Sequence, residues 1–398
     1  MSNFNTPGRL FVSCYKRLSP YLQQEVQALG YTPDDVSTAG LKLTGSLYDA
    51  MRLNMHLRTA SQVYYELASF TADDPDALYR EVYRIDWPEW LRADGYVSIS
   101  SFVQHPSINN PMYANIRVKD AVVDKFRDTV GQRPDTGPLL SKAVVHLFWT
   151  ENGASLYLDT SGETLAKHGY RLYPGKAPML ESLAAATVLA SGWDPSKPLL
   201  NPMCGSGTLA IEAALLATHR KPGLLRRNYG FMHLVPFERD AYLEAVLDLE
   251  DEVIDLPTLS IYAGDHSREA IRLARMNAEK AGVAELIRFE YEDFRRTRFP
   301  TQPGTLLLNP EYGERLGELD ELASTYKEIG DWMKKNAQGW EAYIFSGNPE
   351  LAKHIGLQAS RRIEFYNGRI DSRLLRFELY AGSRQREKTG VEPDEQSD

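Results

Sequence analysis

The sequence predicts an α/β protein in which a doubly wound parallel sheet follows a smaller α+β region. Three observations lead to this prediction. An apolar strand, a glycine-containing turn and a helix-like run follow one another directly between Leu199 and Leu216. Strand and helix patterns then alternate from residue 259 to residue 380. Residues 9–67 carry strand, helix, strand, helix and strand patterns in that order.

The N-terminal region, residues 1–60, is expected to form a small α+β domain. Apolar patterns predict strands at 9–15, 36–43 and 60–67, and helices at 22–29 and 47–57. Gly30 follows the first of these helices and is typical of a helix end.

A second unit is expected over residues 61–165. The patterns predict helices at 75–82 and 112–129, a strand at 96–99, and a hairpin of strands 143–149 and 154–159. The hairpin should turn at Glu151-Asn152-Gly153. Residues 160–178 are rich in turn-forming residues, and the main domain boundary is expected there.

The third unit, residues 166–382, holds the doubly wound sheet. A strand is expected from Leu199 up to the turn that includes Pro202, and further strands at 259–265, 287–293, 305–310, 341–346, 362–366 and 374–380. Helices are expected at 179–190, 209–216, 269–281 and 319–336. Residues 219–255 read as an insertion of mixed character. Residues 383–398 are charged and almost without apolar side chains, so we expect a disordered tail.

Composition narrows the class of protein. The chain has 54 acidic against 45 basic residues, a formal net charge of −9, so bulk charge does not indicate nucleic-acid binding, and any RNA contact needs a local basic face. Two distant cysteines, Cys14 and Cys204, favour a reducing, cytoplasmic setting. No apolar run is long enough to cross a membrane, the N-terminus lacks the apolar core of a signal peptide, and no His/Cys cluster predicts a metal site.

Polar residues and glycines follow four successive predicted strands. The glycine turn follows the first, Asp265 ends the second, Asp293 ends the third, and Asn309 follows the fourth. The carboxyl ends of parallel strands meet in one crevice where the strand order reverses, so we expect these points to converge. The spacing of Gly205 and Gly207 fits neither a dinucleotide fingerprint nor a phosphate loop.

The two acids suit a nucleoside-bearing cofactor. A carboxylate after the second strand can accept two ribose hydroxyls, and one after the third can accept an exocyclic amine such as that of adenine. Each acid could equally cap a helix or lie in a solvated turn, and Asp265 could cap the helix that begins near Arg268. The ordered occurrence of all four points favours the cofactor interpretation.

Two stretches of the sequence resemble motifs of a known protein family. Asn201-Pro202-Met203-Cys204-Gly205-Ser206-Gly207-Thr208 resembles the first motif of class I S-adenosylmethionine (SAM) methyltransferases. Asn309-Pro310-Glu311-Tyr312, followed by Gly313-Glu314-Arg315, resembles their amine-methylating signature. In this longer form it is similar to RNA guanine-N2 methyltransferases that carry a THUMP domain, the RlmL-like 23S rRNA group in particular.

The segment 158–178 resembles the family's junction between THUMP and catalytic domains, and the likeness runs from near Arg9 to near Gly382. It implies a ferredoxin-like domain at 1–60, a THUMP domain at 61–165 and a Rossmann-like methyltransferase domain at 166–382. It also implies SAM as cofactor and RNA as partner. Longer relatives carry a second methyltransferase domain, whereas a single catalytic domain is expected here.

Two positions depart from the family pattern. Glu311 stands where a second proline is usual, which affects local rigidity and charge at the base pocket. His168 stands where arginine is usual. The Glu311 carboxylate could interact with a guanine edge or simply point to solvent.

The candidate residues follow from the motifs. The expected catalytic residues are Asn309, Pro310 and Tyr312: the first two orient the amine through their carbonyl oxygens, and the third stacks on the base. The expected cofactor-binding residues are Asn201, Pro202, Cys204, Gly205, Ser206, Gly207, Thr208, Asp265, His266, Asp293, Phe294 and Asn309.

Basic residues before and within the connector are candidate RNA contacts. They are Arg117, Lys119, Lys125, Lys167, Tyr170, Arg171 and Arg315. Acids at Asp120, Asp124 and Asp128 interrupt the basic residues of the helix at 112–129, and this pattern favours a solvated helix face over an RNA contact there.

Other readings stay open at this stage. The same motif could serve a tRNA guanine or another planar nitrogen, because Asn-Pro-x-Tyr orients any planar amine. A catalytically decayed RNA-binding or ribosome-assembly protein is the rival of another class, and Glu311 is the residue that favours it. We expect a monomer or a weak homodimer with no membrane or metal partner.

Overall fold

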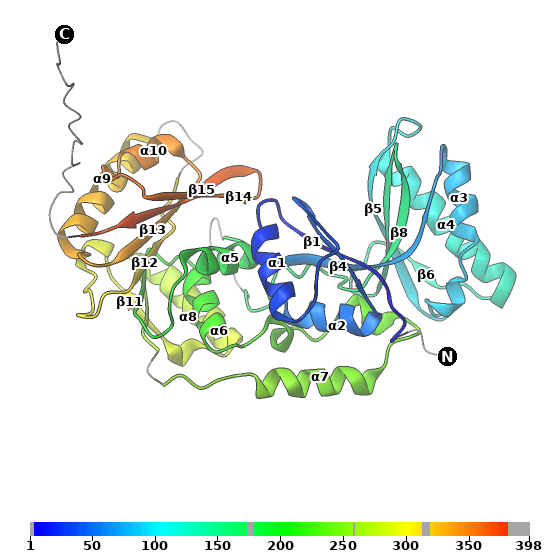
Figure 1. Ribbon diagram of the computed structural model, residues 1–398, viewed down its shortest axis with the longest axis horizontal. Helices are drawn as coiled ribbons and strands as arrows, with labels where there is room; N and C mark the ends of the chain where they lie inside the picture. Colours follow the sequence, from blue (N-terminus) through cyan, green and yellow to red (C-terminus); the bar gives the residue numbers. More distant parts are fainter. Residues whose placement is uncertain (1–3, 173–178, 258, 313–318, 381–398) are drawn as a thin grey trace, which may run out of the picture.

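The computed structural model describes residues 4–172, 179–257, 259–312 and 319–380. Its strands form two sheets, an eight-stranded one from the N-terminal half and a seven-stranded one from the C-terminal half. The two sheets lie toward opposite ends of an elongated molecule (Figure 1). The predicted fold class is confirmed. The expected tail at 383–398 lies outside the described residues.

The eight-stranded sheet joins the first two predicted units. Its strands, in spatial order, are β2 (Asp35–Ser37), β3 (Gly40–Gly45), β1 (Gly8–Cys14), β4 (Ala60–Phe70), β8 (Gly153–Asp159), β7 (Ala143–Thr150), β5 (Tyr96–Gln104) and β6 (Asp135–Thr136). β4 pairs with β1 on one side and β8 on the other, so Tyr64 lies between Phe11 and Asp159. The boundary expected at residue 60 therefore falls at the start of a strand that both units share.

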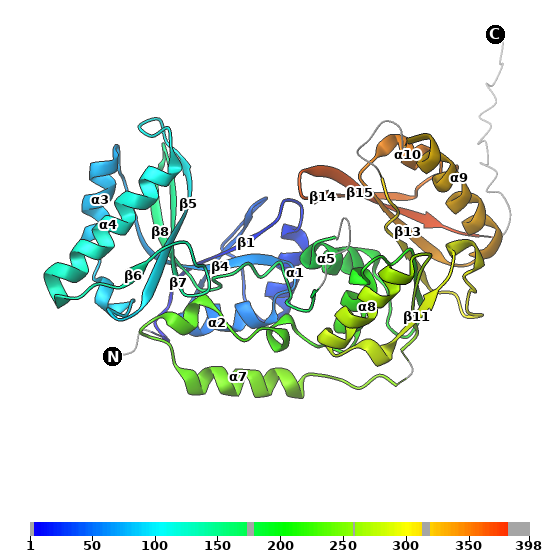
Figure 2. The same ribbon diagram turned by 180° about the vertical axis from the view of Figure 1, so that it is seen from behind.

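Helices cover one face of this sheet. They are α1 (Ser19–Ala28), α2 (Leu47–His56), α3 (Pro75–Tyr83) and α4 (Pro111–Val130). Figure 2 shows α3 and α4 against the same side of β5 and β8. Burial alternates along β1, where Leu10 and Val12 are buried in the core while Phe11 is only partly buried. The face that carries Phe11 is the more open one.

Two N-terminal predictions were wrong in detail. The strand expected at 36–43 is two short strands, β2 and β3, joined by a turn in which Ser37 pairs with Gly40. The helix expected at 22–29 begins at Ser19, because Pro20 occupies its first turn, where the missing N–H of proline costs nothing.

The seven-stranded sheet is doubly wound. Its strands, in spatial order, are β11 (Ile287–Tyr291), β10 (Ile261–Asp265), β9 (Leu199–Pro202), β12 (Thr305–Leu308), β13 (Glu341–Ser346), β15 (Ile370–Glu378) and β14 (Arg361–Asn367). The first five run parallel, and β15 runs antiparallel to both its neighbours. The chain order reverses between β9 and β12, which is where such sheets bind ligands.

Helices pack on both faces of this sheet. Those on one face are α5 (Glu181–Ser191), α6 (Thr208–Ala217) and α8 (Arg268–Ala281), and those on the other are α9 (Leu319–Asn336) and α10 (Pro349–Lys353). Leu307 enters the first core, whereas Leu306 and Leu308 enter the second, as the alternation of a strand requires. Short 3-10 helices lie at Trp87–Glu89, Pro222–Leu225, Gly230–His233, Ala284–Leu286 and Phe294–Arg296.

The insertion at 219–255 ties the two halves together. It contains α7 (Arg239–Asp251), which Figure 1 shows running beneath α2. The ring of Phe237 packs edge-on against Phe4, with 6.4 Å between centroids. From the other side, Arg58 Nη2 donates to the carbonyls of Leu215 and Arg220 at 3.0 and 2.8 Å. The C-terminal half is thus bound to the N-terminal α+β part by packing and by buried hydrogen bonds.

Candidate functional site

The glycine turn after β9 is held by the end of β10. The backbone N–H groups of Met203 and Cys204 both donate to the Gly264 carbonyl at 2.8 Å. The next N–H, of Gly205, donates to Asp265 Oδ2 at 2.9 Å. The turn and the first strand-end acid are therefore one hydrogen-bonded unit.

Three residues of this turn have left-handed backbone conformations. The φ angles are +56° at Gly205, +84° at Gly207 and +105° at Met203. A Cβ on Gly207 would lie 2.9 Å from the Cβ of Ala274 in α8, so only glycine fits there. Sequence reasoning missed Met203, whose strained backbone is of the kind that accumulates at functional sites.

The four predicted points converge on one edge of the seven-stranded sheet. Gly264 of β10 is in register with Pro202 of β9, which places Asp265 level with the turn. The N–H of Glu292 donates to the Asp265 carbonyl at 3.1 Å, so Asp293 follows at the same edge. β12 pairs with β9 only through its first two residues and then leads to Asn309.

The two acids differ in what they already bind. Asp265 is only 9% exposed, and Oδ1 also accepts from Ser267 N at 2.8 Å, while Ser267 itself caps α8. Asp293 caps the short helix after it through Arg295 N and pairs with the Arg295 guanidinium at 2.9 Å. The capping interpretation thus holds for Asp293 and not for Asp265, although the remaining lone pairs of both carboxylates could still accept from a ligand.

Two amide oxygens at this edge have no hydrogen-bond partner among the residues that the structure describes. Asn201 is fully buried, and its Nδ2 donates to the Leu307 carbonyl at 2.8 Å, which leaves Oδ1 unpaired. The Oδ1 of Asn309 is buried and likewise unpaired. Buried acceptors without donors are costly in a folded chain, so a ligand that brings N–H or O–H groups fits here.

Tyr312 is hydrogen-bonded to a residue near the C-terminal end of the same domain. Its hydroxyl accepts a hydrogen bond from Asn367 Nδ2 at 2.6 Å. A Cβ on Gly347 would lie 2.9 Å from its ring, so the ring passes directly over that glycine. Pro310 is buried and Glu311 is exposed. Asn367 and Gly347 were not predicted, because they are 55 and 35 residues from Tyr312 and carry no motif.

The other candidate cofactor-binding residues differ in how far their side chains are exposed. Burial, and next the Asp265 carboxylate, raise the pKa of the Cys204 thiol. Ser206 and Thr208 are buried, and Asn277 Nδ2 donates to the Ser206 carbonyl at 3.1 Å. His266 remains exposed beside Asp265. The ring of Phe294 is only 8% exposed and packs on Trp332, so only its main chain is free to meet a ligand.

The predicted RNA contact at Tyr170 is contradicted. Its side chain is 1% exposed and its hydroxyl donates to Glu212 Oε1 at 2.8 Å. His168 joins the same carboxylate through Nδ1 at 2.8 Å, and its Nε2 lies 2.9 Å from the Arg58 carbonyl. Glu212 belongs to α6, so this buried network joins the connector to the C-terminal sheet domain and, through Arg58, to the N-terminal domain.

Arg171 is also structural. Its Nη2 donates to Thr208 Oγ1 at 3.0 Å, and its Nε lies 3.5 Å from Glu181, with only 11% of the side chain exposed. Two of the three connector predictions, Tyr170 and Arg171, thus failed for the same reason: hydrogen bonds and an ion pair with α5 and α6 draw these side chains inside, although the segment looked like a surface loop. Lys167 is exposed, and Arg315 lies outside the described residues.

The candidates on α4 are engaged locally. Arg117 pairs with Asp76, Lys119 with Asp120, and Lys125 lies over the ring of Tyr83. Arg117 and Lys119 line a cavity of about 590 Å³ together with Arg127 and Arg133. Acids and bases alternate there, as expected from the sequence, and the RNA role of these residues stays a prediction.

The open face of the eight-stranded sheet carries aromatic rings that sequence reasoning missed. Phe102 and Phe148 are stacked with centroids 5.2 Å apart, and they are 45% and 42% exposed. Tyr64 lies 4.8 Å from the His146 ring and 6.1 Å from the ring of Phe11, to which it is nearly parallel. Period-two alternation with an aromatic on the outward position is the signal that could have found them.

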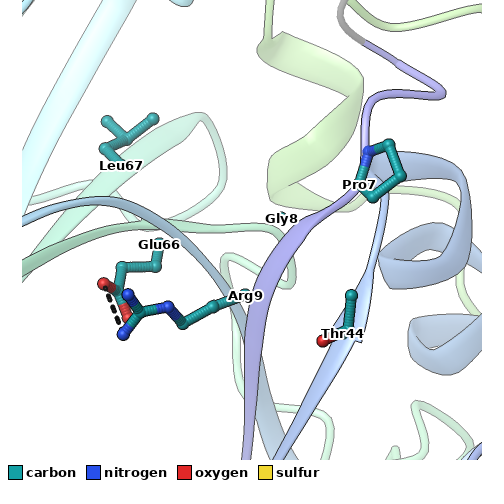
Figure 3. A pocket seen from close by; sticks show the side chains of 6 residues that line it. All are labelled: Pro7, Gly8, Arg9, Thr44, Glu66 and Leu67. Carbon is teal, nitrogen blue, oxygen red and sulfur yellow. Dashed lines mark ion pairs between the residues drawn. The ribbon is translucent and has the colours of Figure 1, made fainter.

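A pocket of about 260 Å³ lies between β1, β3 and β4 and is lined by Arg9, Thr44 and Glu66 among others. Figure 3 shows Arg9 and Glu66 facing each other in it, with Thr44 across from them. The Arg9 side chain is 75% exposed although its guanidinium is 3.7 Å from Glu66. It therefore presents positive charge two residues along β1 from Phe11.

Within the described ranges, no three His, Cys, Asp or Glu side chains gather as a metal would require. None of the helices in the part of the chain that the structure describes is both long and apolar enough to span a bilayer.

Family models match the chain over three stretches. The RlmL ferredoxin-like domain matches residues 9–64, the THUMP domain residues 72–159, and the RMKL-like methyltransferase domain residues 168–376. Ribosomal RNA large subunit methyltransferase K/L of Syntrophotalea carbinolica is 39% identical over 387 residues, which cover 94% of this chain and 54% of that protein. The same-named protein of Allochromatium vinosum is 36% identical, over 93% and 51%. The chain spans about half the length of these curated relatives.

Solved structures agree with these matches. A possible methylase from Clostridium difficile is 27% identical with a TM-score of 0.86, covering 96% of this chain and 100% of that one. A predicted N6-adenine-specific DNA methylase from Listeria monocytogenes is 28% identical with a TM-score of 0.84, covering 95% and 97%. SMU.472, solved in complex with SAH, has a TM-score of 0.85 at 24% identity over 95% and 99%, which supports the fold alone.

Proposed function

The chain belongs to the RMKL-like methyltransferase family, and from this membership we propose that it transfers a methyl group from SAM to the exocyclic N2 of a guanine in 23S rRNA. The curated relatives are named for large-subunit ribosomal RNA. The THUMP domain beside the methyltransferase domain supports an RNA substrate.

The observation that carries the proposal is the buried, unpaired Oδ1 of Asn309. An exocyclic amine is a poor nucleophile because its lone pair is delocalised into the ring. An oxygen that accepts its N–H favours a pyramidal nitrogen and aims the lone pair, which is catalysis by orientation. Asn309 Oδ1 and the Pro310 carbonyl are the two acceptors we assign to this task.

The residues at the turn fit SAM. The unpaired Oδ1 of Asn201 suits an ammonium donor, and the Asp265 carboxylate retains lone pairs for ribose hydroxyls. The glycine turn allows close approach of a ligand to its backbone, and Asp293 suits the adenine amine. When bound, SAM supplies the methyl group as an electrophile.

The target base needs an aromatic ring to stack on, and it must be able to reach the site. Tyr312 follows the two acceptors directly, and its ring is the stacking partner we assign to the guanine. A base inside a helix is out of reach, so the target must be unpaired or flipped out. The exposed rings of Phe102 and Phe148 are further contacts that we assign to unpaired RNA, because every base has a face that stacks on an aromatic ring.

Nucleoside mass spectrometry tests the proposal. Large-subunit rRNA transcribed without modifications is incubated with the protein and SAM, digested, and searched for N2-methylguanosine. We expect this nucleoside with the wild-type protein and none with Asn309→Ala. N6-methyladenosine instead would overturn the assignment of the base, and methylation of tRNA but not rRNA would overturn that of the substrate. A wild-type protein that does not bind SAM by calorimetry would support a non-catalytic scaffold.

A further inference from the structure

We infer that Asn367 is a positioning residue for the reaction: it fixes the ring of Tyr312 against the target base. The inference rests on the proposed function. Asn367 contacts neither the glycine turn nor the acids of the site in any hydrogen bond among the described residues, so its effect must pass through Tyr312.

Tyr312 is constrained at two points of its ring. The hydroxyl accepts from Asn367 Nδ2 at 2.6 Å, a short and well-formed bond. One ring edge lies so close to Gly347 that an added Cβ would come within 2.9 Å of Cε2. A tyrosine ring turns about two side-chain bonds, and contacts at its edge and at its hydroxyl remove both freedoms.

The backbone that carries Asn367 is itself fixed. Asn367 ends β14 and pairs with Ile370, which starts β15, across a two-residue turn. Gly368 opens this turn at φ +61°, a conformation that glycine adopts without strain. The turn therefore presents the Asn367 amide from a defined position.

The hairpin is also anchored on the ferredoxin-like domain. The ring of Tyr21 in α1 stacks on Phe365 with centroids 5.7 Å apart. Lys16 Nζ donates to the Tyr366 hydroxyl at 3.1 Å. Figure 1 shows the β14–β15 hairpin reaching toward α1. The support of Tyr312 thus extends to the N-terminal domain.

A fixed ring matters because methyl transfer needs a narrow range of geometries. A base that stacks on a tilted ring no longer presents its amine in line with the methyl group, and a misplacement of about 1 Å can cost about a hundredfold in rate. Loss of the Asn367 bond should therefore lower kcat for RNA methylation while the affinity for SAM is unchanged.

A double-mutant cycle tests the inference. kcat and KM are measured with unmodified large-subunit rRNA and tritiated SAM for the wild type, Asn367→Ala, Tyr312→Phe and the double variant. We expect each single variant to lose about ten- to a hundredfold in kcat, and the double variant to lose no more than either. Asn367→Asp should recover most of the rate, because its carboxylate can accept from the Tyr312 hydroxyl.

The matched control is Asn336→Ala, which removes an asparagine whose Nδ2 donates to the Trp332 carbonyl at 2.9 Å elsewhere in the same domain. It should keep the wild-type kcat. A rate for Asn367→Ala equal to that of this control would overturn the inference, as would losses that multiply in the double variant. If the wild type does not methylate the RNA, the proposed function fails instead. In that case NMR of a protein labelled with ¹³C-tyrosine still tests the inference. If Asn367→Ala leaves the resonance of Tyr312 unchanged, Asn367 does not hold the ring.

Discussion

The side-chain amide of Asn201, at the end of β9, donates to the Leu307 carbonyl in β12 at 2.8 Å. The two strands pair by backbone only at their first residues, so this bond spans the place where they begin to separate. Separation at the reversal of strand order opens the crevice in which such sheets bind ligands. Asn201 therefore limits the width of the opening and holds the strand that leads to Asn309.

Replacing Asn309 by alanine should abolish methyl transfer. The variant loses the acceptor that orients the amine, and we expect kcat to fall by at least about a hundredfold, as when one oriented polar group is removed from an active site. The affinity for SAM, measured by calorimetry, should stay close to the wild-type value. A variant that turns over at the wild-type rate would remove Asn309 from the chemistry.

Asp265→Ala should weaken cofactor binding more than chemistry. The carboxylate holds Gly205 N and remains available to ribose hydroxyls, so its loss should raise the Kd for SAM by about tenfold or more, the effect of losing one hydrogen bond to a charged group. Glu269→Ala is the control, because that carboxylate is exposed and pairs with Arg272 one turn further along α8. Equal affinities for the two variants would contradict the assignment.

Gly207→Ala should destabilise the protein by about 3 kcal/mol. About 1–2 kcal/mol comes from a side chain at φ +84°, and the remainder from the approach of the new Cβ to Ala274. Gly192→Ala provides a matched comparison, since Gly192 has φ +63° with nothing within 4 Å of an added Cβ. That variant should lose only about 1–2 kcal/mol in urea unfolding. Equal losses would mean that the contact with α8 is not tight.

His168 should make stability depend on pH. Burial lowers the pKa of the His168 ring. The charge of Glu212 and the hydrogen bonds to Glu212 and to the Arg58 carbonyl raise it by more, so the pKa lies above its ordinary value of 6.5. Both ring nitrogens face acceptors, which favours the doubly protonated ring. A raised folded pKa gives stability that is complete below about pH 6.5 and is lost as pH rises through the folded value. The difference in unfolding free energy between the wild type and His168→Gln should shrink over that range.

The buried ring of His146 should change stability with pH in the opposite direction. Burial lowers its pKa to about 4, so the ring is neutral in the folded chain where the unfolded one is charged. Its contribution should make stability rise as pH increases from about 4 to about 6.5. A His168→Gln difference that grows rather than shrinks with pH would contradict the buried ion pair.

Phe102→Ala with Phe148→Ala should weaken the binding of unpaired RNA. Loss of one stacked base costs about 1–3 kcal/mol, or roughly five- to 150-fold in Kd. The probe is a fluorescein-labelled, unstructured RNA 12-mer, measured by anisotropy without SAM. Leu247→Ala, at a side chain 60% exposed on α7, is the control and should bind as the wild type does. Equal binding by all three proteins would show that the RNA lies elsewhere.

The alternation of strands and helices was sufficient to predict the catalytic sheet. Each expected strand from Leu199 onward is present, because a buried parallel strand is a short apolar run that ends in polar residues. The pair β2 and β3 was missed as a hairpin, since Val36 to Leu43 reads as one apolar pattern and its turn at Thr38-Ala39 lacks a strong turn signal.

The site was predictable where it follows strand ends and not where it depends on distant contacts. Asp265 and the glycine turn meet because neighbouring parallel strands end at one edge. Nothing in the sequence relates Asn367 to Tyr312, since that bond depends on how a hairpin folds back. The misplacement of Tyr170 has the same origin: a tyrosine in a polar connector looks exposed until Glu212 of α6 is brought beside it.

β4 belongs to two domains at once, with β1 on one side and β8 on the other. A shared strand leaves little room for a hinge, so the ferredoxin-like and THUMP domains should travel as a single body. If the chain acts on RNA as proposed, an RNA bound to the THUMP domain would reach the strand-end site at a fixed distance. That distance along the RNA, together with the identity of the base, would then decide which nucleotide is methylated.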